Sequence, residues 1–92
     1  MTPIGAAAAG TVRQAGHVEG YGLTVTVDHA DGTATLYAHQ AQVGVAAGAV
    51  VTAGQVIGHV GRTGSSTTDH LHFEVHDSTG AAVDPLLHLP LR

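Results

Sequence analysis

Residues 69–76 (Asp-His-Leu-His-Phe-Glu-Val-His) constrain the fold most, because polar and apolar side chains alternate without a break from His70 to His76. Successive side chains of a β-strand point to opposite faces, so this alternation predicts one strand with an apolar core face. The other face would carry three imidazoles and a carboxylate, from His70, His72, Glu74 and His76. Two residues along a strand span roughly 6 to 7 Å, so two of these imidazoles could reach one small volume. The pattern favours a polar site, with a solvated strand face as the alternative.

The rest of the chain also predicts strands and tight turns. Residues 22–29 and 33–39 alternate, and Asp31-Gly32 between them is typical of a hairpin turn. In the second strand, we expect His39 at the strand end, on the polar face with Thr35 and Tyr37. The remaining predicted elements are an extended segment at 3–9, a strand at 11–15 closed by a turn at 16–20, two or three short strands within 43–61, and a turn at 77–80.

Composition narrows the class of protein. A length of 92 residues predicts a single domain over residues 1–92, and the richness in Gly, Ala, Val and Thr favours an all-β fold. The formal charge of −4, with no basic cluster, argues against a nucleic-acid partner. No run approaches the roughly 18 apolar residues of a membrane span. The N-terminal residues do not have the pattern of a secretion signal, so we expect any export segment to lie upstream.

Several motifs in fixed order resemble one protein family. They are Tyr37-Ala38-His39, the turn at 54–58, Thr63-Gly64 with Ser66-Thr67, and His70-Leu71-His72-Phe73-Glu74-Val75. Together they resemble the lysostaphin-type (LytM-like) zinc endopeptidases, which cut peptide bonds in bacterial peptidoglycan. The resemblance implies an antiparallel β-sandwich/barrel hybrid with short Gly-rich turns, Zn²⁺ as cofactor, peptidoglycan peptides as partner, and an extracellular or cell-envelope location.

The resemblance also implies roles for individual histidines. His72 matches a zinc ligand, whereas His70 and His39 match the residues that orient and deprotonate the attacking water. The family's other two ligands come from a His-x-x-x-Asp motif that would precede Pro3, and no internal pair has that spacing. We therefore expect an N-terminally truncated domain with an incomplete zinc site. Its exposed strand edge predicts a homodimer.

Other functions remain open at this stage. The missing ligands suggest a non-catalytic member that binds peptidoglycan or regulates another hydrolase. A phosphocarrier with a phosphorylated histidine is a minor alternative, whereas a biotinyl or lipoyl carrier is excluded because the chain has no lysine.

Side chains outside the three matched histidines have more ordinary predicted roles. We expect His29 to be structural, His76 solvated, Glu74 structural or an acceptor for an imidazole N–H, and Tyr37 either half-buried or directed into a groove. The run at 65–68 is expected to form a turn, and His17, His59 and His88 have no assigned role.

Overall fold

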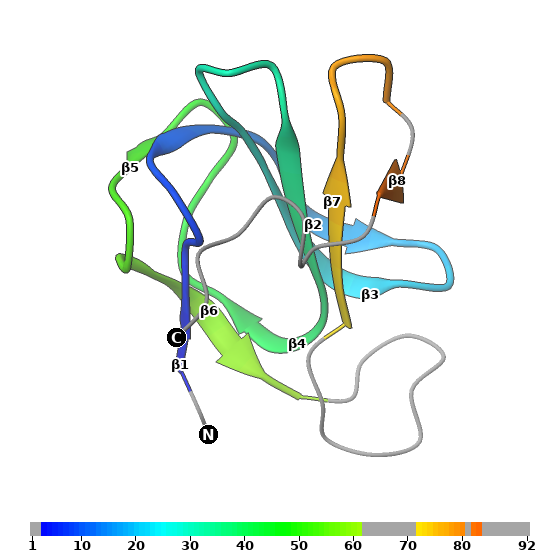
Figure 1. Cartoon of the computed structure of the whole chain (residues 1–92). Helices are drawn as coiled ribbons and strands as arrows, with labels where there is room; N and C mark the ends of the chain where they lie inside the picture. Colours follow the sequence, from blue (N-terminus) through cyan, green and yellow to red (C-terminus); the bar gives the residue numbers. More distant parts are fainter. Residues whose placement is uncertain (1–2, 62–71, 81, 84–92) are drawn as a thin grey trace.

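In its described residues, the computed structural model has eight β-strands, all paired antiparallel in one curled sheet (Figure 1). The structure describes residues 3–61, 72–80 and 82–83. The strands are β1 (Pro3–Gly5), β2 (Gly10–Val18), β3 (Gly22–Asp28), β4 (Ala34–Val43), β5 (Val50–Val51), β6 (Val56–Val60), β7 (His72–His76) and β8 (Ala82–Val83). The predicted all-β antiparallel fold is thereby confirmed. In the described part of the chain no helix has the length and apolarity to cross a membrane.

Strand β4 is the centre of the sheet and gives it a branch. The main strand order is β1-β6-β4-β3-β2-β5, and β7 pairs with both β4 and β8. One edge of β4 pairs with β3, whereas its other edge is shared by two strands. Residues Ala34 to Ala38 pair with β7, and Gln40 to Val43 pair with β6. The prediction that this strand ends at His39 is therefore wrong, because the chain continues beyond it to pair with a second neighbour.

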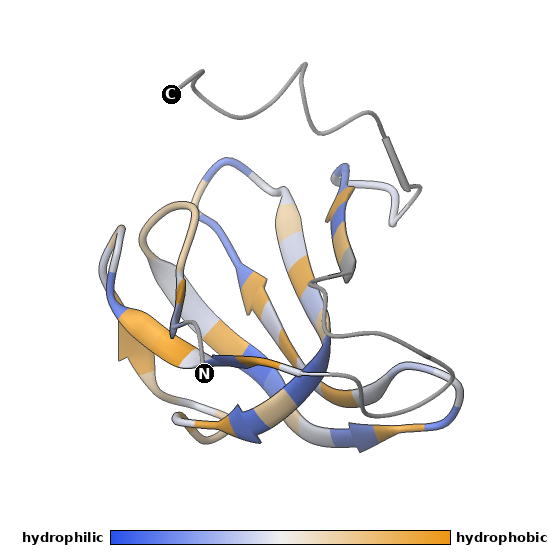
Figure 2. Ribbon diagram, turned by 90° about the horizontal axis from the view of Figure 1, so that it is seen from below, coloured by the Kyte–Doolittle hydropathy of each residue, from blue (hydrophilic) through white to orange (hydrophobic). Residues whose placement is uncertain are grey.

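The sheet curls around an apolar core. Apolar and polar bands alternate along the strands in Figure 2. The core contains Ile4, Ala6, Val12, Val25, Val27, Tyr37, Val51 and Ile57, with Phe73 packed against it. The rings of Tyr37 and Phe73 have centroids 5.2 Å apart, which joins β7 to the core. The described part of the predicted 69–76 strand thus has the expected core face, with Val75 also buried.

The burial of Tyr37 shows that the prediction of a polar face for β4 is wrong. Only 1% of its surface is exposed, and Thr35 is buried on the same face. Ala34 and Ala38 on the opposite face are buried too, so both faces of this strand are covered. A tyrosine can occupy such a core when its hydroxyl has hydrogen-bond partners.

Those partners form a chain of hydrogen bonds, buried between Thr35 and Tyr37, that runs from β4 to the segment between β1 and β2. The Ala7 N–H donates to Tyr37 Oη (2.8 Å), and Tyr37 Oη lies 2.8 Å from Thr35 Oγ1. His29 Nε2 lies 2.8 Å from the same Thr35 oxygen, and His29 Nδ1 is 2.8 Å from the Ala9 carbonyl oxygen. With His29 neutral, one direction of donation satisfies all the groups: Nδ1–H donates to Ala9, and Nε2 accepts from Thr35. His29 is therefore structural, as predicted, and burial raises the pKa of the Tyr37 phenol.

Two of the predicted turns are confirmed, and one was placed too early in the chain. Gly32 and Gly80 have positive φ values of 89° and 88°, and both lie in the turns expected from the sequence. The segment 43–61 contains two short strands, also as expected. The predicted turn at 16–20 is wrong, because β2 continues to Val18 and Gly16 pairs with Thr24. The actual turn lies around Gly20 and Tyr21.

Replacing Tyr37 with Phe should lower the free energy of unfolding by about 1 to 3 kcal/mol. The substitution keeps the ring but leaves the buried Ala7 N–H without its acceptor and Thr35 without its donor. Urea denaturation followed by circular dichroism measures the change. An unfolding free energy equal to that of the wild type would show that this chain of hydrogen bonds does not stabilise the fold.

Gly58 of β6 packs directly on the buried side chain of Gln40. A Cβ at Gly58 would lie 1.7 Å from Gln40 Oε1 and 2.6 Å from the Gln42 carbonyl oxygen. Gly58→Ala should therefore destabilise the fold by about 1 to 3 kcal/mol, as overpacking does. Gly44→Ala is the matched control, because its Cβ would have nearest contacts of 3.5 to 3.7 Å. Equal thermal midpoints for both variants would contradict this account of the β4–β6 contact.

Candidate functional site

A hollow of about 240 Å³ opens where the β2–β3 turn, β4 and β7 meet. It is lined by Gly20 and Tyr21 from the turn, His39 from β4 and Glu74 from β7. These residues lie far apart in the sequence and are brought together by the pairing of β4 with β3 on one edge and β7 on the other. The hollow therefore combines an imidazole, a phenol and a carboxylate.

His39 reaches this hollow because the regular alternation of β4 is broken at its position. Leu23 pairs with Gln40 and Val25 pairs with Tyr37, so Ala38 and His39 together stand opposite one residue of β3. This arrangement is a β-bulge, which redirects side chains and bends the strand. The backbone of His39 has a φ of 57°, the left-handed region that a non-glycine residue enters at a cost of about 1 to 2 kcal/mol. In an unbroken strand, His39 would share the face of the buried Tyr37 instead.

The His39 backbone is held by the hairpin tip. Its N–H donates to the Tyr21 carbonyl oxygen over 2.8 Å. His39 is half-buried, so its imidazole is neither fully solvated nor part of the core. The sequence-based prediction of a polar position for His39 agrees with its place in the hollow, although the structural reason is the bulge and not a strand end.

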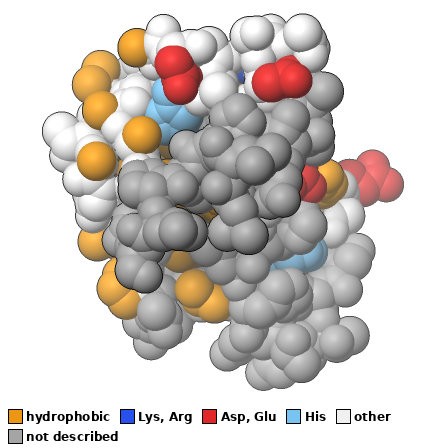
Figure 3. Space-filling model, viewed as in Figure 1, with side chains coloured by type: hydrophobic (Ala, Val, Ile, Leu, Met, Phe, Trp, Pro, Cys, Tyr) orange, Lys and Arg blue, Asp and Glu red, His pale blue; other side chains and the backbone are white. Residues whose placement is uncertain are grey.

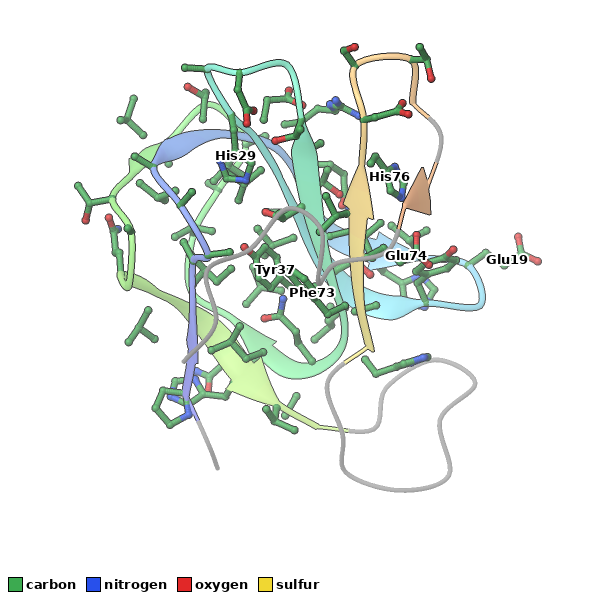
Figure 4. All side chains as sticks on the ribbon, viewed as in Figure 1. Glu19, His29, Tyr37, Phe73, Glu74 and His76 are labelled. Carbon is green, nitrogen blue, oxygen red and sulfur yellow. The ribbon has the colours of Figure 1, made fainter. Side chains whose placement is uncertain are left out.

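Glu74 is fixed from two sides. The Tyr21 hydroxyl donates to Glu74 Oε2 over 3.1 Å, and His76 Nε2 lies 2.8 Å from Glu74 Oε1. Figure 4 shows Glu74 and His76 on the side of β7 away from Tyr37 and Phe73. The hydrogen bond to Glu74 raises the pKa of the Tyr21 phenol.

The contact between His76 and Glu74 corrects the prediction for His76 and refines the prediction for Glu74. The His76 side chain is 24% exposed and bonded to Glu74, so the expectation of a solvated histidine is wrong. Glu74 is an acceptor for an imidazole, one of the two roles expected for it, and the imidazole is that of His76.

The other two matched histidines lie at or beyond the limit of the described residues. The backbone of His72 pairs with Ala38, so β7 places this residue beside the position that precedes His39. His70 lies outside the described residues, as do the run at 65–68 and His88. The structure therefore places the His72 backbone opposite Ala38, one residue before His39.

The described residues do not by themselves fit a complete zinc site. Within 3–61, 72–80 and 82–83, no three side chains of His, Cys, Asp or Glu lie close enough together to hold a metal ion. Around the hollow, Glu74 already accepts hydrogen bonds on both oxygens.

A second hollow, of about 530 Å³, lies over the ends of β2, β3 and β5. Its ionisable side chains, Asp28 and His29, both have structural partners: Asp28 pairs with Arg13, and His29 belongs to the hydrogen-bond chain. On the face of the molecule shown in Figure 3, the acidic side chains lie toward the edges. The smaller hollow contains the motif-matched His39 together with Tyr21 and Glu74, so it is taken as the candidate site.

Tyr21 is the site residue that the sequence-based interpretation missed. The expected turn was placed before it, and alternation of polarity carries no information about a hairpin tip. The available signal was the Gly20-Tyr21-Gly22 triplet, since both glycines adopt positive φ values of 79° and 74°. Flanking glycines of this kind indicate a turn centred on the residue between them.

The sequence matches Peptidase family M23 over residues 1–85. It is 45% identical over 85 residues to the DD-carboxypeptidase/endopeptidase Mpg of Neisseria meningitidis serogroup B, covering 92% of this chain and 19% of that protein. It is 39% identical over 84 residues to the murein hydrolase activator EnvC of Escherichia coli, covering 91% of this chain and 20% of EnvC. The chain thus spans about a fifth of the length of these curated relatives.

A solved structure shows the same fold. The catalytic domain of the antimicrobial peptidase lysostaphin from Staphylococcus simulans superposes with a TM-score of 0.86 and 35% sequence identity, covering 94% of this chain and 68% of that domain. The lysostaphin-like fold expected from the sequence motifs is confirmed by this similarity. Because the family match covers nearly the whole chain and the fold agrees, this chain belongs to peptidase family M23.

Proposed function

We propose that this chain is a zinc-dependent endopeptidase domain that hydrolyses peptide bonds of bacterial peptidoglycan in the cell envelope. The observation that carries the proposal is the bulge in β4, which turns His39 into the hollow next to the strand that bears His72. Membership of family M23 supports the reaction class. The working unit is proposed to be a single domain over residues 1–92, and the homodimer expected from the sequence stays a prediction.

Each matched histidine receives a role in this proposal. His72 is a metal ligand, and further ligands come from outside the described residues. A bound Zn²⁺ supplies Lewis-acid polarisation of the scissile carbonyl in such peptidases. His39 and His70 orient the attacking water, accept its proton and donate hydrogen bonds to the developing oxyanion. Imidazole suits this task because its unperturbed pKa lies near neutrality.

A non-catalytic role is the second candidate. One observation favours it: a relative of the chain, EnvC of Escherichia coli, is named a murein hydrolase activator. In that case, the hollow and neighbouring strands would hold a peptide without cleaving it, by backbone pairing of the kind that strand edges provide.

His39→Ala should reduce the rate of peptidoglycan hydrolysis by roughly 100- to 10,000-fold, the range lost with a general acid–base group. The loss of turbidity of purified peptidoglycan measures this rate. His17→Ala is the matched control, because His17 is exposed on β2 and lines neither hollow. If both variants hydrolyse peptidoglycan at the wild-type rate, His39 has no part in the chemistry.

Removal of zinc separates the two candidate functions. For the peptidase, a chelator should abolish hydrolysis, added Zn²⁺ should restore it, and His72→Ala should lower the zinc content measured by atomic absorption. The non-catalytic candidate predicts a different result. The wild-type chain would contain no zinc and would hydrolyse nothing, but it would still sediment with purified cell walls.

A further inference from the structure

The tip of the β2–β3 hairpin is built to present one residue toward the candidate site. Gly20 and Gly22, both with positive φ, flank Tyr21, and the Tyr21 N–H donates to the Val18 carbonyl oxygen over 3.0 Å. This turn directs the Tyr21 carbonyl and phenol toward two different strands. Neither group is used by the proposed chemistry.

The carbonyl of Tyr21 contacts β4 at its irregular position. His39 is part of the β-bulge, where two residues of β4 stand opposite one of β3, and its N–H donates to the Tyr21 oxygen at 2.8 Å. A residue held in the left-handed region persists only when its surroundings specify that conformation. This hydrogen bond is one such contact, and it acts directly on the backbone that aims the imidazole.

The phenol of the same residue contacts β7. Its hydroxyl donates to Glu74 Oε2 at 3.1 Å, and the other oxygen of Glu74 is bonded to His76. Glu74 is also anchored through its backbone, which pairs with Leu36 of β4. The hairpin tip is thus tied to both strands that border the hollow.

We propose that Tyr21 is a positioning residue, which fixes the His39 backbone through its carbonyl and holds the hairpin tip against β7 through its phenol. Loss of the phenolic hydrogen bond would remove a direct contact between the hairpin tip and Glu74 of β7. The carbonyl would then hold the His39 N–H less often. The catalytic consequence rests on the proposed peptidase function, whereas the conformational consequence does not.

Tyr21→Phe tests the proposal by amide hydrogen exchange, measured residue by residue by NMR. Loss of a hydrogen bond to a charged group should speed exchange of the His39 amide by about 10-fold, with little change at the Val25 and Val27 amides in the body of the hairpin. Glu74→Gln weakens the same contact from its other side and should give a smaller increase at His39. In the active enzyme, Tyr21→Phe should lower kcat with little change in KM.

Tyr37→Phe is the matched control, because Tyr37 is the other of the two tyrosines and also donates through its phenol. It should speed exchange across the core through loss of global stability, without a selective effect at His39. Unchanged His39 exchange in Tyr21→Phe, or an equal rise at all hairpin amides, would overturn the proposal. A selective rise at His39 in a chain that hydrolyses nothing would support the positioning role and count against the peptidase function alone.

Discussion

The bulge in strand β4 is the constraint on which the rest of the site depends. One edge of β4 pairs with two strands in succession. Strand β7 pairs with it up to Ala38, and β6 pairs with it from Gln40 onward, so the partner changes at His39. The change of partner and the bulge against β3 coincide at this residue. The backbone therefore takes a left-handed conformation there, and the side chain leaves the core face for the hollow.

Two sets of hydrogen-bonded polar side chains have different structural roles. His29, Thr35 and Tyr37 form a chain of hydrogen bonds, buried at Thr35 and Tyr37, that ties β4 to the segment after β1. The second set contains Tyr21 and Glu74, which are hydrogen-bonded to each other and partly exposed. They border a hollow beside His39. His29 and His39 therefore have different roles. Both ring nitrogens of His29 are hydrogen-bonded within the fold, whereas His39 faces the candidate site.

Sequence reasoning performed best where local chemistry decides the structure. Asp31-Gly32 specifies a tight turn by its backbone preferences, and the alternation of residues 73–76 specifies a strand with Val75 inside. It failed where long-range pairing decides. Tyr37 was placed on a polar face because it alternates with apolar residues and shares a face with Thr35 and His39. Its hydroxyl nevertheless accepts a hydrogen bond from Ala7, thirty residues away, and this partner stabilises the buried phenol. The hairpin turn was placed too early because Gly16 is a strand residue when Thr24 lies opposite it.

By itself, the sequence determined the all-β class and most of the order of short strands and turns, and it predicted catalytic or metal-binding roles for His39, His70 and His72. Those features depend on side-chain alternation, glycine placement and residue types in a given order, which are local properties. Only the tertiary structure decided how His39 leaves the core face and that Tyr21 contacts both neighbouring strands. These features arise from register and strand branching, which depend on pairings between residues far apart in the chain.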